Sequence, residues 1–180
     1  MQFAAAFLEY LVTGCGGLLW VIPLFNNAPL ELGKLEKVEV ALLFPLVYVL
    51  GMMIDFVSVK LVSRFKNRIR RDLGAPKHDI PSTAFIAWHS AELSREFQVR
   101  SSRDRIARGA TLNMLLLALV ALLRPSTPAV LHLSFGRPLA VLVFLGVAAL
   151  CFAIWWRCEY LSSNFKRQAV DTIIKHPKGK

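Results

Sequence analysis

The sequence predicts an all-α polytopic membrane protein: a four-transmembrane-helix bundle with short cytoplasmic helical extensions. Two observations carry this prediction. The composition is 55% hydrophobic with a mean hydropathy of +0.48, which is too apolar for an ordinary soluble domain of 180 residues. The basic residues also gather on one side of four apolar segments. A soluble bundle is disfavoured, because soluble helices carry an amphipathic stripe, whereas residues 138–156 carry no charge on any face.

The first two apolar segments cover residues 3–25 and 40–62. A bilayer core about 30 Å thick needs roughly 20 helical residues to cross it. The second segment meets this length directly, and the first meets it with Glu9 near one end. We therefore expect both segments to span the membrane.

The third and fourth apolar segments cover residues 109–123 and 138–156. The third has only 15 uncharged residues. It spans the membrane if Arg108 and Arg124 extend their charges to opposite interfaces. The fourth is long enough without such help. The expected organisation is two transmembrane helices in 1–62, a basic cytoplasmic helical segment in 63–108, two transmembrane helices in 109–157, and a cytoplasmic helix and tail in 158–180.

The distribution of Lys and Arg predicts the orientation. Of the 22 basic residues, 11 lie in 63–108, six lie in 157–180, and Lys60 adjoins them. Only four lie on the other side of the predicted spans. By the positive-inside rule, both termini face the cytoplasm, and we expect an integral protein of the bacterial inner (plasma) membrane.

The basic segment 63–108 is expected to form two helical arms, separated by Gly74, Pro76 and Pro81. The second arm is predicted to run from Ala84 into the third span, with Ser82 or Thr83 as its cap. A third extension, 159–174, follows the last span. The charged residues of the first two arms form a candidate surface for a partner protein or for anionic lipid headgroups: Arg64, Arg68, Arg71, Glu92, Glu96, Arg100 and Arg103.

Two carboxylates, Glu9 and Asp55, are expected at similar depth inside the spans. A charge at membrane depth costs roughly 2.5–3.5 kcal/mol, so it is normally paired or faces water. In one interpretation these carboxylates pair with Arg105, Arg108 or Arg157 and fix the register of the bundle. In the other, a carboxylate lines an aqueous vestibule of a cation pathway or proton relay.

Three further residues are candidates for helix packing. Asn113 is a polar group deep in the third span, where it is expected to hydrogen-bond a neighbouring helix. Gly14 and Gly17 make one face of the first helix thin, which permits close helix approach within the chain or between subunits.

The sequence contains no pattern that identifies a reaction. The four histidines lie outside the predicted spans at spacings that suit no metal site, and no G-x-S-x-G, P-loop or H-E-x-x-H motif occurs. No cofactor or metal is expected, and the protein is predicted not to be an enzyme. Nucleic acid is a disfavoured partner, because basic residues beside membrane spans are explained by anionic headgroups.

Three function classes follow. The first is an oligomeric membrane anchor or sensor that presents basic helices to a cytosolic partner. The second is a small ion channel or membrane-perturbing effector, assembled as a ring, and the third is a membrane enzyme. In general, small four-span proteins without catalytic motifs often serve as membrane components of two-gene bacterial systems, including phage-defence systems. This general expectation does not come from particular residues of the chain.

Overall fold

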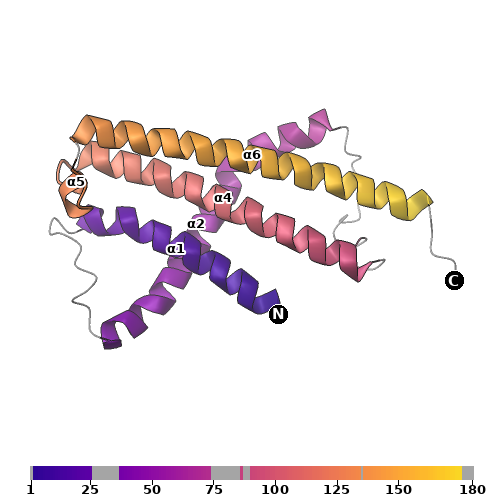
Figure 1. The fold of residues 1–180 in the computed structure, drawn as a ribbon, viewed down its shortest axis with the longest axis horizontal. Coiled ribbons are helices and arrows are strands. Elements are labelled where there is room, and N and C mark those ends of the chain that lie inside the picture. The colour runs from indigo at the N-terminus through magenta and orange to yellow at the C-terminus, as the bar shows by residue number, and fades with distance from the viewer. Residues whose placement is uncertain (1, 26–36, 74–85, 87–89, 135, 176–180) are drawn as a thin grey trace.

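The computed structural model describes residues 2–25, 37–73, 86, 90–134 and 136–175 of the chain. Four long helices form a bundle, as predicted, and a short helix lies at one end (Figure 1). Each long helix is long and apolar enough to cross a membrane. The chain is thus a membrane protein with transmembrane helices. Its elements are α1 (Gln2–Phe25), α2 (Lys37–Asp72), α4 (Ala91–Leu123), α5 (Thr127–Val130) and α6 (Arg137–Lys175).

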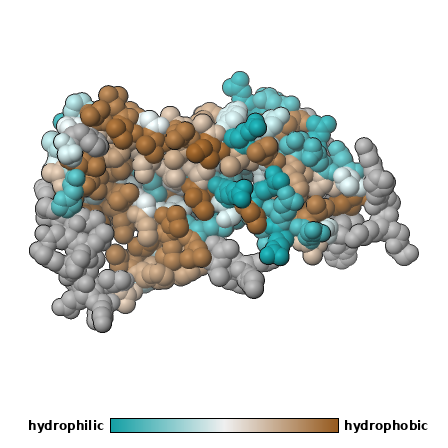
Figure 2. Space-filling view, viewed as in Figure 1, coloured by the Kyte–Doolittle hydropathy of each residue, from teal (hydrophilic) through white to brown (hydrophobic). Residues whose placement is uncertain are grey.

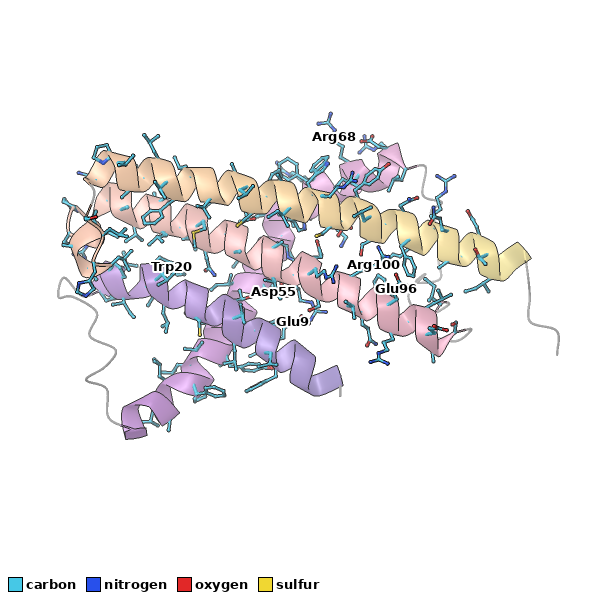
Figure 3. The ribbon with its side chains drawn as sticks, in the orientation of Figure 1. Glu9, Trp20, Asp55, Arg68, Glu96 and Arg100 are labelled. Carbon is cyan, nitrogen blue, oxygen red and sulfur yellow. The ribbon has the colours of Figure 1, made fainter. Side chains whose placement is uncertain are left out.

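The helices continue well beyond their apolar parts. α2, α4 and α6 contain 36, 33 and 39 residues, whereas a span needs only about 20. Figure 2 shows hydrophobic residues over the half of the bundle that contains α5 and hydrophilic residues over the other half. We call this hydrophilic half the basic end, because Arg68 and Arg100 lie there (Figure 3). The apolar spans and the charged extensions are therefore parts of the same helices.

The start of α4 differs from the prediction. The helix begins at Ala91 rather than at Ala84, because Ser90 adopts an extended conformation with φ −152° and caps it. The Ser90 hydroxyl accepts a hydrogen bond at 3.3 Å from the Leu93 N–H, which would otherwise lack a partner in the first turn. The caps expected from the sequence, residues 82 and 83, lie outside the described residues.

At the end of the bundle near α5, side chains donate hydrogen bonds to the last carbonyl oxygens of α4. The Arg137 guanidinium donates to the carbonyl oxygens of Ala121 and Leu122, at the end of α4. The Thr127 hydroxyl donates to the Arg124 carbonyl at 2.9 Å. Because the last carbonyls of a helix lack partners within the helix, these bonds fix the turn from α4 into α5 and α6.

α4 is the central helix of the bundle. It packs along α6 and also contacts α1 and α2, while α1 packs against α2. Just over half of the apolar part of α4 is buried, compared with 22% for α2 and for α6. The outward faces of α2 and α6 are apolar and uncovered, as suits helices that face lipid tails. The core between α4 and α6 is formed by Leu117, Ala118, Ala121, Ala140 and Phe144.

A buried charge network as the candidate functional site

Three helices each place a buried or half-buried charge at the end of an apolar run. Glu9 in α1, Asp55 in α2 and Arg108 in α4 each end an uncharged run of 15 or 16 residues. At 1.5 Å per residue, such a run is about 22–24 Å long, several ångströms shorter than the apolar core of a bilayer. We therefore expect these charges to lie within the depth of a normal bilayer, where each needs a partner.

Arg108 is the centre of the network. Its side chain is only 7% exposed and reaches from α4 to α2. The guanidinium donates to Asp55 Oδ1 at 2.5 Å, to the Ser58 hydroxyl at 3.1 Å and to Asp104 Oδ2 at 3.4 Å. Charge-assisted bonds are stronger than neutral ones, so Arg108 fixes the position of α2 on α4. Of the three partners considered for Asp55 from the sequence, the structure places Arg108 against it.

Glu9 provides the corresponding connection from α1. Its carboxylate is 91% buried and accepts a hydrogen bond at 3.0 Å from Arg105 on α4. Figure 3 shows Glu9 and Asp55 close to one another in the view, near the crossing of α1 and α2. Glu9 and Asp55 thus use different arginines, one helical turn apart on α4.

The basic end of the network contains residues that the sequence did not single out. Lys66 of α2 lies 3.3 Å from Glu159 of α6, whose carboxylate also accepts a hydrogen bond from Ser163. Asp104 lies one turn before Arg108 on α4 and is buried. In the sequence, Lys66 and Glu159 lie in predicted cytoplasmic extensions, and nothing marks them as a pair. Only the ion pair between Asp104 and Arg108 could have been predicted, from their i,i+4 spacing on one helix.

Arg157, a third candidate cation, lies apart from this network. It is exposed on α6, and no ion pair is found for it among the described residues. Glu159 supplies the α6 contribution instead. Positions 157 and 159 are about 200° apart around a helix, so when Glu159 faces α2 and α4, Arg157 faces outward.

The charged surface predicted on the arms divides into two groups. The Arg100 guanidinium lies over the Phe165 ring of α6 at 4.6 Å, which helps to hold α4 and α6 together. It also donates a hydrogen bond to the Glu96 carboxylate at 2.6 Å. A second cation–π contact joins Lys166 to Phe97 at 4.5 Å. The remaining residues of the predicted surface are exposed, and Figure 3 shows Arg68 pointing away from the bundle: Arg64, Arg68, Arg71, Glu92 and Arg103.

The packing candidates lie where α1 meets its neighbours. Asn113 is buried between α1 and α4, where it donates to the Thr13 carbonyl at 2.8 Å and accepts from Trp20 Nε1 at 3.0 Å. Gly14 faces the backbone of α2 at Val47. Gly17 faces Leu50 and Ile54 of α2.

We expect Asn113→Leu to destabilise the bundle by about 1 kcal/mol, because both of its interhelical hydrogen bonds would be lost. Trp20→Phe removes only the bond to the indole N–H and should cost less. Unfolding of the four proteins of the double-mutant cycle, measured in detergent with increasing sodium dodecyl sulfate, tests this. If the two effects simply add, the Trp20–Asn113 bond contributes nothing.

The site offers no assembled metal centre. Among the described residues, no group of three His, Cys, Asp or Glu side chains is placed to hold a metal ion. No protein-family model, curated protein or solved structure matches the chain. The chemistry of the site is that of ion pairs and hydrogen bonds that join four helices near the basic end.

Proposed function

We propose that the protein is a non-enzymatic membrane anchor or sensor subunit that presents its basic end to a soluble partner protein. The observation that supports this proposal most is that two helices are continuous from the apolar span into the charged extension. α4 and α6 each run without a break from an apolar span into a charged extension. From here on, the word arms refers to these two extensions, residues 91–108 of α4 and residues 157–175 of α6, and no longer to the two helices predicted within 63–108. A continuous helix keeps its arm in a fixed relation to its span, so a displacement in the membrane moves the arm.

The contacts between the arms support a presented surface rather than two separate tails. Arg100 with Phe165 and Lys166 with Phe97 join the arms at two successive positions. Each such contact contributes about 0.5–1 kcal/mol at an exposed site. Arg103 on α4 and Arg64 and Arg68 on α2 stay exposed at this end. A partner with an acidic surface suits these groups, and the positive-inside rule makes that partner cytosolic.

The proposal includes assembly of several copies. The outward faces of α2 and α6 are long and apolar, so they have room for a second copy as well as for lipid. A small channel is the alternative function. It needs a carboxylate that faces an aqueous path, whereas Asp55 is held by Arg108 at 2.5 Å. This pairing favours the anchor.

We expect charge reversal on the exposed basic surface to abolish partner binding while the bundle survives. The variant is Arg64→Glu with Arg68→Glu, which replaces attraction to an acidic partner by repulsion. The tagged protein would be purified from its native host in mild detergent, and proteins present in near-stoichiometric amount would be identified by mass spectrometry. The partner should fall at least tenfold in the variant, as expected for several lost charge contacts.

Lys34→Glu is the control, because it changes a charge in the segment between α1 and α2, on the other side of the predicted spans. It should retain the partner. An equal yield of partner with the Arg64 and Arg68 variant would contradict the proposed docking surface. A clean homo-oligomer with no soluble partner would favour the channel, and ion flux through liposomes with Asp55→Asn would then be the next measurement.

A further inference from the structure

Asp104 is the least satisfied charged group of the network. It lies on α4, is 6% exposed, and faces α6. Its Oδ2 atom is 3.4 Å from Arg108. Its buried Oδ1 atom makes no hydrogen bond of normal geometry, although the Trp155 indole N–H, which is also buried without such a bond, lies near the carboxyl. A buried carboxylate whose donors are distant or poorly aligned has lost its water without full compensation, which costs about 1–3 kcal/mol.

The groups around Asp104 come from three helices. Glu159, Trp155 and Cys158 face it from α6, and Lys66 faces it from α2. On α4 itself, Arg108 lies beside Asp104, and Arg103 lies near Cys158. Glu159 is 3% exposed, so two buried carboxylates from facing helices repel one another here. α1 contributes Glu9, which is already paired with Arg105.

Among the side chains that the structure describes, the network has one more negative than positive charge. Its four acids outnumber its three cations; the acids are Glu9, Asp55, Asp104 and Glu159, and the cations are Arg105, Arg108 and Lys66. The distances indicate which acid is uncompensated. Arg108 is 2.5 Å from Asp55 but 3.4 Å from Asp104, and Glu159 has Lys66 at 3.3 Å. The excess charge therefore resides on Asp104.

We propose that Asp104 is a proton-binding site of the folded bundle, and that its proton keeps the arms of α4 and α6 packed together. The proton comes from solvent and forms an O–H bond with the carboxylate, which brings the network to neutrality. The new hydroxyl is a donor, and the Glu159 carboxylate that faces it is an acceptor. When the pH rises and the proton leaves, Asp104 and Glu159 repel one another across the α4–α6 contact, and the arms separate.

This site exists with or without a soluble partner, so it does not depend on the proposed function. If the arms do dock a partner, the same site makes docking sensitive to pH. The two proposals are tested separately, because protonation of Asp104 is measured on the purified protein without a partner.

The first test is the infrared difference spectrum between mildly acidic and mildly alkaline buffer, recorded on the purified full chain in detergent. Acidification should produce the C=O stretching band of a protonated carboxylic acid. Asp104→Asn should lose one carboxyl from that band and should fold normally, because Asn resembles the neutral acid in shape. Asp171→Asn is the matched control, since Asp171 is an exposed acid on α6.

The second test is the distance between the arms. Spin labels would be attached at Gln98 on α4 and Gln168 on α6, both exposed, after replacement of the three native cysteines by alanine. The distance should increase in alkaline buffer and stay short at both pH values in Asp104→Asn. The proposal is overturned if Asp104→Asn keeps the complete acid band or fails to assemble, or if the distance in the unsubstituted arms does not respond to pH.

Discussion

Arg108→Ala is expected to destabilise the bundle by about 3–5 kcal/mol, because removing one partner of a buried ion pair leaves the other charge uncompensated. In this protein the loss is at the upper end. Arg108 serves two buried or half-buried carboxylates, Asp55 and Asp104, and also donates to Ser58. Its loss would leave the network with one cation fewer at membrane depth, where water cannot replace the missing donors.

The measurement is unfolding of the purified protein in detergent with increasing sodium dodecyl sulfate, followed by circular dichroism. Arg103→Ala is the matched control, because Arg103 lies on the same helix but is exposed. It should change the free energy of unfolding by less than about 0.5 kcal/mol. Equal losses in the two variants would show that the Arg108 bonds do not hold the bundle together.

A charge swap tests the pair with Asp55 directly. Asp55→Arg alone places two cations side by side, and adding Arg108→Asp restores opposite charges. We expect the double variant to be more stable than Asp55→Arg but less stable than the unsubstituted protein, because Asp104 then faces a second acid at position 108. If the second change brings no recovery, the pairing of Asp55 with Arg108 does not support the register of α2.

Gly51→Leu should separate α1 from α2 and cost about 3 kcal/mol, at the upper end of the range for overpacking. A Cβ atom at position 51 would overlap the Tyr10 carbonyl oxygen and lie 3.1 Å from the Gly14 nitrogen. Backbone atoms cannot rotate out of the way as a side chain can. Because Glu9 immediately precedes Tyr10, moving α1 would also strain the bond between Glu9 and Arg105.

Gly146→Leu is the matched control, since it makes the same change on α6, where no described atom beyond the neighbouring backbone of α6 itself lies within 4 Å of the added Cβ. Its effect should be smaller than about 0.5 kcal/mol, and the apolar side chain would face outward. The same unfolding assay compares the two. Similar stabilities of the Gly51 and Gly146 variants would contradict the close approach of α1 and α2.

The charge network and the glycine contact act on the same pair of helices. Gly14 and Gly51 bring the backbones of α1 and α2 together, and this approach holds Glu9 and Asp55 at one level against α4. α4 then carries the connection to its arm, which is bound to the arm of α6. A displacement of α1 or α2 is thus expected to reach the basic end through packed side chains and a continuous helix.

The sequence by itself determined the class of the protein. Four apolar stretches separated by polar segments can satisfy their backbone groups in a bilayer only as helices. The lengths of the apolar runs therefore predicted the spans, and the absence of charge from 138–156 disfavoured a soluble bundle. The expense of a charge at membrane depth also drew attention to Glu9 and Asp55 and to cations near them. These inferences need only composition and spacing along one helix.

Only the tertiary structure decided which cation meets which acid and which acid is left over. Arg105, Arg108 and Arg157 were equivalent in the sequence, because their distances from Asp55 depend on how α2, α4 and α6 cross. The crossing is set by glycines and alanines at the contacts between helices, such as Gly14, Gly51 and Ala118. Lys66, Asp104 and Glu159 are far apart in the sequence and come together only when three helices pack. The excess negative charge arises because acids and cations from different helices are brought together, so it cannot be predicted from any one helix.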